Sequence, residues 1–291
     1  MADAAPRKDA YTVYADDGYY SETTYFLTEE SYQSVTAQAP QQNTGAQKLS
    51  AKTEQPSNFV MAVEKKVWVE ETVNAHGVVD SRLLKKAEIE ENQVIENEAY
   101  AVPTAVTANP SEVGRANTSK YALRISMYVA EVNGEYTTTG MAWWEHELGT
   151  NEETAEISAR DYIALTWGGR DTLQSNQPRF YAYDYDGDEI IGSLCYSDPY
   201  AGYVWDFDEK TALGADNIAK YIEVSNTISK GFGEILGETT YTRLTYRHYF
   251  KERHPSITLE IDEDGKLAAS VTFSTVENSW EIMIAVPGIV Y

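Results

Sequence analysis

The segment Tyr121–Trp144 constrains the fold more than any other stretch of the chain. In its first half, apolar residues alternate with polar ones such as Arg124, and this period of two is typical of a strand with one buried face. Asn133-Gly134 follows, and both residues tolerate the positive φ angles of a type I′ turn. The second half, Glu135–Trp144, is rich in Thr and aromatic residues. The segment therefore predicts a β-hairpin to which the other strands are added.

Further alternating segments follow the hairpin, and residues typical of turns separate them. The predicted strands cover residues 162–167, 180–185, 189–196, 203–207, 219–228, 239–250, 257–261, 267–273 and 280–286. Asp186-Gly187-Asp188 and Asp264-Gly265 predict two more hairpin turns. Strands at this spacing predict an all-β fold over residues 119–291, an antiparallel β-sandwich of jelly-roll or Ig-like topology.

The first 118 residues are organised differently. Residues 1–36 are rich in Tyr, Thr and acids and predict an extended N-terminal arm that docks onto the main body or onto a neighbour. Residues 37–58 have the polar composition of a flexible linker. Residues 59–118 predict a small β or α+β segment with a second linker, since residues 59–69 alternate like a strand. Ser81–Ala99 fits an amphipathic helix, and a charged β-hairpin is the alternative.

The composition narrows the classes of partner. Acidic residues outnumber basic ones 46 to 23, giving a net charge of −23 that disfavours nucleic acids and anionic membranes. No segment is apolar and long enough to span a bilayer. The single cysteine, Cys195, excludes an internal disulfide. The start, MADAAPRKDA, lacks the apolar core of a signal peptide, so either the protein is not exported by that route or a signal has been removed.

Carboxylates provide the first candidates for chemistry. Asp184, Asp186 and Asp188 alternate into a turn, as ligands do in a calcium loop. However, the glycine falls at the fourth position rather than at the sixth position of an EF-hand loop. A hairpin tip is the favoured interpretation, and a calcium site is the alternative. Asp206 and Asp208 share one strand face and offer paired carboxylates for glycoside hydrolysis, but a solvated strand face is the favoured interpretation.

No other cofactor is predicted. His146 lies between Glu145 and Glu147, and His248 lies near His254, but no set has the ligand spacing of a zinc site. We expect His248 to have a hydrogen-bonded structural role. The chain has no nucleophile elbow and no phosphate-binding glycine loop, so no catalytic residue is predicted.

Aromatic residues provide a candidate binding surface. Trp144, Tyr181, Tyr183 and Trp205 lie on predicted strands and can stack on sugar rings if they face solvent together. Packing in the core or in an interface is the favoured interpretation, and tyrosine suits both roles because one end of the ring is apolar.

Three motifs carry a family resemblance, namely Arg160–Trp167, Tyr203–Phe207 and the TYRHYF segment Thr245–Phe250. In their order along the chain, residues 121–284 resemble uncharacterised exported all-β proteins of Gram-positive, Clostridia-like bacteria. The resemblance implies an all-β fold and a location outside the cell. It brings no catalytic residues.

These observations together predict a non-enzymatic extracellular or surface protein that acts by binding or self-assembly, in a structural or adhesive role. Its expected partners are copies of itself or another surface protein, reached through the N-terminal arm, because exposed sheet edges accept added strands. The alternatives are a carbohydrate-binding module with a polysaccharide partner, and a virion or other particle protein. A carboxylate-based hydrolase ranks last.

Overall fold

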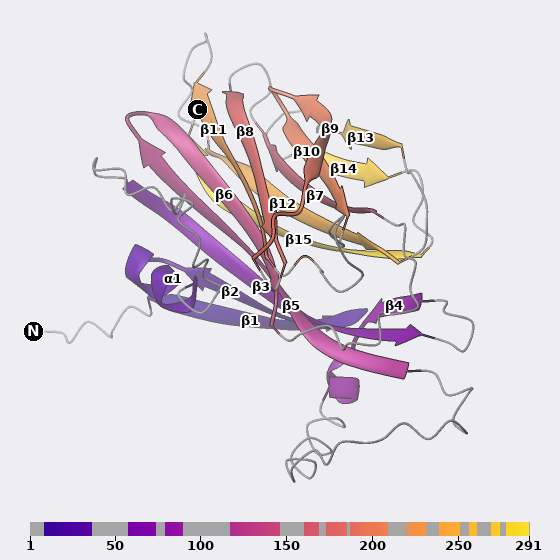
Figure 1. The fold of residues 1–291 in the computed structure, drawn as a ribbon. Helices are drawn as coiled ribbons and strands as arrows, with labels where there is room; N and C mark the ends of the chain where they lie inside the picture. The colour runs from indigo at the N-terminus through magenta and orange to yellow at the C-terminus, as the bar shows by residue number, and fades with distance from the viewer. Residues whose placement is uncertain are drawn as a thin grey trace, which may run out of the picture.

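We describe a computed structural model of the 291-residue chain. It describes residues 9–36, 58–73, 79–89, 117–145, 160–168, 173–184, 187–208, 219, 221–230, 239–250, 256–260, 269–273 and 278–290. These residues form mainly antiparallel strands in two packed sheets (Figure 1), which confirms the predicted all-β sandwich. No helix within these ranges is long and apolar enough to cross a membrane.

The larger sheet has eight strands. They are β1 (Ala10–Asp17), β2 (Tyr19–Phe26), β3 (Asn58–Val73), β4 (Val79–Leu83), β5 (Asn117–Val132), β6 (Glu135–Trp144), β8 (Leu173–Tyr183) and β11 (Tyr221–Lys230). Their order is β1-β2-β3-β5-β6-β11-β8, and β4 pairs with β3 beyond the end of β2. The predicted central hairpin is confirmed, since β5 and β6 pair across Asn133 (φ 55°) and Gly134 (φ 81°).

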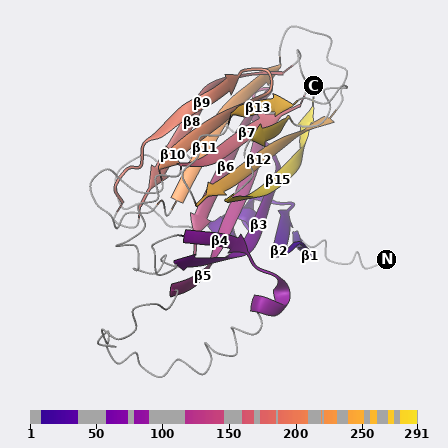
Figure 2. The same cartoon turned by 90° about the vertical axis from the view of Figure 1, so that its right-hand side faces the viewer.

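The smaller sheet has five strands and packs against the larger one (Figure 2). They are β7 (Arg160–Trp167), β9 (Gly192–Asp198), β10 (Gly202–Asp208), β12 (Thr239–Tyr249) and β15 (Ser279–Val290). Their order is β15-β12-β7-β10-β9. Strands β13 (Ile257–Glu260) and β14 (Ser270–Phe273) form a separate pair, as predicted for residues 257–273.

The main core lies between the two sheets because alternate residues of each strand turn inward. Leu123, Ile125 and Met127 of β5 are fully buried against inward residues of the smaller sheet such as Leu244. The sheets are tightly packed at Gly140 of β6, where an added Cβ atom would lie 2.5 Å from Leu244 Cδ1. A side chain at position 140 would therefore push the sheets apart.

Both outer faces are partly covered. On the smaller sheet, Phe273 of β14 packs edge-to-face against Tyr162 and Tyr249. On the larger sheet, the helix α1 (Glu29–Thr36) places Tyr32 against Phe26. These contacts build two smaller hydrophobic clusters outside the main core.

The N-terminal residues belong to the larger sheet. The β1–β2 hairpin pairs with β3 through β2, so the predicted arm is docked onto the main body by its strands. The predicted boundary at residue 118 falls inside β5, and β3 pairs with β5 over most of its length. Within the predicted helix or hairpin over residues 81–99, β4 ends at Leu83 and residues 86–89 form a helical turn. Residues 37–57 and 90–99 lie outside the described residues.

The predicted hairpin around Asp186-Gly187-Asp188 needs a correction. The chain does reverse there, since Tyr183 bridges to Glu189 and Ile190 N–H donates to the carbonyl of Ala182 at 2.9 Å. However, β8 pairs with β11 in the larger sheet, and β9 pairs with β10 in the smaller one. The turn residues fix only the local reversal, and the chain then crosses from one sheet to the other.

Candidate binding edge at strand β1

Strand β1 forms one edge of the larger sheet (Figure 1), and only β2 pairs with it among the described residues. All six residues from Tyr11 to Asp16 are exposed, whichever face of the sheet their side chains occupy. A strand that is open on both faces and along its outer edge offers its backbone to another chain.

The hydrogen-bond pattern shows which backbone groups of β1 point outward. Leu27 N–H donates to the carbonyl of Asp9 at 2.8 Å, so these two residues form a hydrogen-bonded pair of the β1–β2 ladder. Bonded and non-bonded pairs alternate along an antiparallel ladder, and the odd-numbered residues of β1 therefore turn their backbone groups toward β2. The even-numbered residues turn theirs away from the sheet, and these are Ala10, Thr12, Tyr14 and Asp16.

Apolar side chains accompany this edge. Tyr11 (44% exposed) stacks on Tyr25 of β2, with ring centroids 5.0 Å apart, and Val13 (49% exposed) lies on the same face. Tyr14 (64% exposed) lies on the opposite face. The edge therefore combines unpaired backbone groups with apolar surface on both sides.

Each of the two main sheets ends in two strands, and the three end strands other than β1 are each interrupted. Strand β4, which pairs with β3 alone among the described residues, is only five residues long. Strand β8 contains Pro178 next to Gln177, which has a φ of 56°, and its register shifts there. Strand β9 carries a bulge at Cys195, and β15 contains Pro287 beside a register shift. Prolines and bulges are devices that block strand addition. Strand β1 pairs with β2 without a register shift and contains no Pro, Gly, Lys or Arg.

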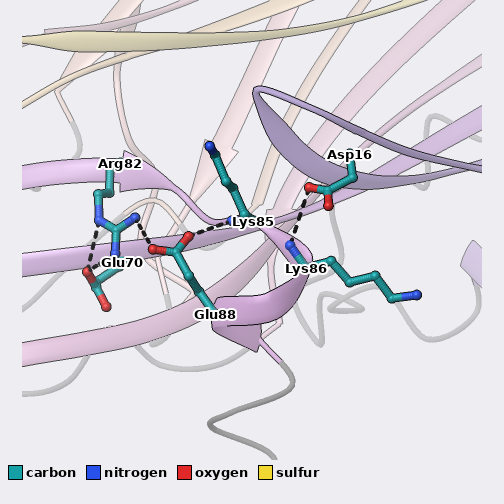
Figure 3. Close-up of polar contacts among 6 residues, drawn as sticks. All are labelled: Asp16, Glu70, Arg82, Lys85, Lys86 and Glu88. Carbon is teal, nitrogen blue, oxygen red and sulfur yellow. Dashed lines mark hydrogen bonds and ion pairs between the residues drawn. The ribbon is translucent and has the colours of Figure 1, made fainter.

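Contacts at its far end attach the β1–β2 hairpin to the body (Figure 3). Tyr20 N–H donates to the carbonyl of Leu84 at 2.8 Å. Lys86 N–H donates to Asp16 Oδ1 at 3.4 Å, as Figure 3 shows. These bonds connect the hairpin to the residues that follow β4. They help to hold β1, which pairs only with β2 within the described residues.

A group of ion pairs holds the residues that follow β4 in place. The Arg82 guanidinium contacts Glu70 of β3 and Glu88 of the helical turn, at 2.7 Å in each case. Glu88 also accepts the N–H of Lys85 at 2.8 Å, as Figure 3 shows. The turn that holds Asp16 is thus linked to two strands of the sheet.

Helix α1 attaches the other end of the hairpin. Tyr32 is buried, its hydroxyl hydrogen-bonds to Ser126 Oγ at 3.0 Å, and its ring stacks on Tyr128 at 5.5 Å. Burial raises the pKa of Tyr32, so the hydroxyl stays protonated at neutral pH. Because α1 follows β2 directly, this contact also restrains the hairpin.

Beside α1, the outer face of the larger sheet carries a charged network that the sequence analysis missed. Arg124 bridges Glu64 and Glu145, and Lys66 contacts Glu145 at 2.5 Å. Burial raises the pKa of Glu64 although Arg124 opposes the shift. Burial alone would also raise the pKa of Glu145. Hydrogen bonds from Lys66 and Arg124 outweigh the effect of burial and hold the pKa of Glu145 below its ordinary value. Glu64 and Lys66 occupy outward positions of β3, whereas Val63 and Val67 on either side of them face the core. This strand periodicity was the signal available in the sequence.

A second polar cluster lies inside the sandwich core. Asp161 is fully buried and accepts hydrogen bonds from the Tyr246 hydroxyl (2.5 Å), from Tyr249 N–H (2.9 Å) and at His248 Nδ1 (3.0 Å). His248 is buried too, packed 4.9 Å from Trp280. The predicted structural role of His248 agrees with this arrangement, and the cluster orients side chains within the core.

The predicted calcium ligands are placed as follows. Asp184 is buried, and its Oδ1 accepts the N–H of Asp188 at 2.8 Å, so this carboxylate caps the turn. Asp188 is exposed, and Asp186 lies outside the described residues. No group of three or more His, Cys, Asp or Glu suited to a metal occurs in the described part of the chain. A calcium site at this turn stays a prediction.

The four predicted surface aromatics do not share a surface. Trp144 (2% exposed) and Trp205 (3% exposed) both point into the main core. Tyr181 and Tyr183 lie half-buried on the outer face of β8. Tyr181 and Tyr183 remain candidates for a binding surface, whereas the two tryptophans stabilise the sandwich.

The remaining candidates have ordinary surroundings or are not described. Asp206 forms an ion pair with Arg160 at 3.2 Å. Cys195 is exposed on β9, and its thiol donates to the carbonyl of Val204 at 3.2 Å. His146 and His254 lie outside the described residues.

Comparisons with known proteins give little beyond this geometry. No family model and no curated protein matches the chain. One solved structure concerns pH-induced modulation of Streptococcus parasanguinis adhesion by Fap1 fimbriae. It is 10% identical, and the match covers 57% of this chain and 77% of that one, with a TM-score of 0.27. Another, the C-terminal domain of the Streptococcus agalactiae AgI/II polypeptide BspA, is 6% identical over 65% of this chain and 88% of that one, also at 0.27. Likeness at this level carries no argument about function.

Proposed function

We propose that this protein acts outside the cell or at its surface by self-association, in which the β1 edge of one copy pairs with the β1 edge of another. The observation that carries the proposal is the contrast between the four strands that end the two main sheets. Three are interrupted by proline or a bulge, whereas β1 is regular and exposed from Tyr11 to Asp16. Unpaired backbone groups along a regular edge form main-chain hydrogen bonds with an added strand.

The expected association is weak. One strand pair buries less surface than a standard protein interface of about 1,600 Å². The net charge of −23 also opposes the approach of two copies. Self-association of this strength operates where copies are concentrated, as they are on a surface, and supports a structural or adhesive role.

Tyr14→Pro tests the proposal. The N–H of Tyr14 points away from β2, so proline at this position removes an outward donor and leaves the β1–β2 ladder intact. Tyr14→Ala is the matched control, because it removes the same side chain and keeps the N–H. Sedimentation velocity over a range of protein concentrations should show reversible dimers for the wild type and for Tyr14→Ala, and monomers for Tyr14→Pro.

Two results would overturn this function. One is a wild-type chain that stays monomeric up to millimolar concentration. The other is a Tyr14→Pro variant that dimerises as well as Tyr14→Ala does. Circular dichroism and thermal unfolding of both variants establish that any difference does not come from unfolding.

The location is a separate part of the proposal. It is supported by the resemblance of Arg160–Trp167, Tyr203–Phe207 and Thr245–Phe250 to exported all-β proteins. Fractionation of the producing cells, with detection by an antibody, should place the protein in the surface or culture fraction. Recovery in the cytoplasmic fraction alone would refute this part and leave the self-association to be judged separately.

A further inference from the structure

Resting on the proposed self-association, we infer its register: two copies pair β1 antiparallel about a two-fold axis that passes through Val13 and is perpendicular to the sheet. The two larger sheets then join into one continuous sheet. The partner is a second copy of this chain, and three properties of β1 select the arrangement.

The first property is the symmetry of the outward backbone groups. Ala10, Thr12, Tyr14 and Asp16 are spaced evenly about Val13. With the axis at Val13, Thr12 lies opposite the partner's Tyr14 and Ala10 lies opposite the partner's Asp16. All four residues then find hydrogen-bonding partners. With the axis at Thr12, Asp16 has no residue of the partner's β1 opposite it. With the axis at Tyr14, Ala10 has no residue of the partner's β1 opposite it.

The second property is the position of the exposed apolar side chains. Residues directly opposite each other in a sheet share a face. The axis at Val13 places the two valines against each other and sets Tyr11 opposite the partner's Ala15, all on the face that carries the Tyr11–Tyr25 stack. Tyr14 covers the partner's Thr12 on the other face. The apolar surface of β1 is therefore covered near the centre of the pair.

The third property is the distribution of charge. The acids of β1 gather at its C-terminal end, at Asp16 and Asp17. A parallel pair would place Asp16 beside the partner's Asp16, and like charges directly opposite each other are destabilising. The antiparallel pair sets Asp16 opposite the partner's Ala10 instead. Only Asp9 and the partner's Asp17 face each other, at the two margins.

Disulfide trapping tests the register. In a Cys195→Ser background, each single variant Val13→Cys, Thr12→Cys and Tyr14→Cys carries the only thiol in the chain. With the axis at Val13, this residue forms a non-hydrogen-bonded pair with itself, with Cα atoms about 4.5 Å apart. That separation allows a disulfide. Oxidised glutathione should therefore convert Val13→Cys into a covalent dimer at least tenfold faster than the other two variants.

A mixed experiment provides an independent readout. Combining Tyr11→Cys with Ala15→Cys should give the mixed disulfide in excess over both symmetric products, because these positions face each other across the axis. Faster trapping of Thr12→Cys or Tyr14→Cys, or an excess of symmetric products, would overturn the register and leave the self-association standing. Monomeric sedimentation of the unmodified chain would overturn the self-association itself.

Discussion

At the scale of single residues, Asp161 is the most demanding position in the described chain. A carboxylate in a sandwich core loses its hydration, and this cost is offset only by strong local hydrogen bonds. Asp161 has three, to Tyr246, His248 and the backbone of Tyr249. All three partners lie on β12, and Asp161 lies on β7. The cluster therefore fixes the register of these two neighbouring strands.

Asp161→Ala should lower the free energy of unfolding by about 3 kcal/mol, because it leaves buried donors without an acceptor. Asp161→Asn should cost less, since the amide oxygen still accepts one or two of the bonds. Urea unfolding followed by tryptophan fluorescence measures both. Asp188→Ala is the control, because this exposed side chain should change the value by no more than about 0.5 kcal/mol. Equal values for Asp161→Ala and Asp188→Ala would contradict the role assigned to Asp161.

Tyr32 is the buried residue through which α1 contacts Phe26, Ser126 and Tyr128 of the larger sheet. Tyr32→Phe removes the hydrogen bond to Ser126 and should cost about 1 kcal/mol of unfolding free energy. Tyr32→Ala also removes the ring from its contacts with Phe26 and Tyr128 and should cost about 3 kcal/mol. Denaturant titrations of the two variants separate the contributions. If the phenylalanine variant were as unstable as the alanine variant, the packing argument would fail.

At the scale of the elements, one glycine and one leucine mark a place where the two sheets pack tightly. Gly140 of β6 faces Leu244 of β12, and no side chain fits between them without a shift. The inner surfaces are complementary in shape at this point. Such complementarity makes the effects of the two positions interdependent.

Gly140→Ala should lower the free energy of unfolding by about 1 to 3 kcal/mol through overpacking. Leu244→Ala should lower it by about 3 kcal/mol through the cavity that it leaves. The double variant should lose clearly less than the sum, because the new methyl group fills part of that cavity. A double-mutant cycle by urea unfolding checks this. Strictly additive changes in the free energy of unfolding would show that the residues at positions 140 and 244 do not contact each other.

Strands with one buried face could be predicted from the sequence, and strands without one could not. The alternation of Leu123, Ile125 and Met127 identified β5, and Asn133-Gly134 identified its turn. Strand β1 was treated as part of an arm, because an edge strand exposed on both faces needs no apolar alternation. The pairing of the arm with β3 is a long-range contact, and nothing in its local composition specifies it. The candidate site is therefore the part of the fold with the weakest sequence signal.

The distinction between local sequence signals and long-range contacts also explains the other differences between the predictions and the structure. Turn chemistry around Gly187 predicted the reversal of the chain but not the sheet that each flanking strand joins, because sheet membership depends on contacts far along the chain. Trp144 and Trp205 were candidates for a surface because aromatic residues suit both cores and binding faces. Asp161 occupies an inward position among apolar residues of β7, and only the partners on β12 show why an acid is tolerated there.

At the scale of the whole molecule, three buried or half-buried carboxyl groups make stability depend on pH. Burial raises the pKa of Glu64, Glu223 and Glu281 above the ordinary glutamate value of 4.5. The positive charges of Arg124 near Glu64 and of Arg247 near Glu281 lower these pKa values but do not cancel the effect of burial. The folded state therefore binds protons at these groups more tightly than the unfolded state does. The contribution of these groups to stability is complete below pH 4.5 and is lost as the pH rises through their folded-state pKa values.

We expect the urea midpoint to rise as the pH is lowered from 8 to 5, because these groups take up protons and the net charge becomes less negative. Glu145, whose pKa is lowered, acts in the opposite direction only as the pH falls further. Glu223→Gln should flatten the dependence, since it removes one of the titrating groups. A midpoint that falls steadily from pH 8 to pH 5 would contradict the assignment.

Salt should strengthen the association of two copies. Screening weakens the repulsion between chains of charge −23 and between the acids at the margins of the β1 pair. Sedimentation equilibrium between 0.05 and 0.5 M sodium chloride should therefore show a decreasing dissociation constant, whatever the register. A dissociation constant that increases with salt would indicate a contact between opposite charges and would contradict strand pairing at β1.

The difference between β1 and the other end strands limits how many copies can join by strand pairing. When two copies pair at β1, the joined sheet ends on both sides at β8, whose proline hinders the addition of a further strand. The bulge in β9 and the proline in β15 hinder addition at the ends of the smaller sheet. End strands that differ in this way favour pairs over the fibres to which sheets with two receptive edges are prone.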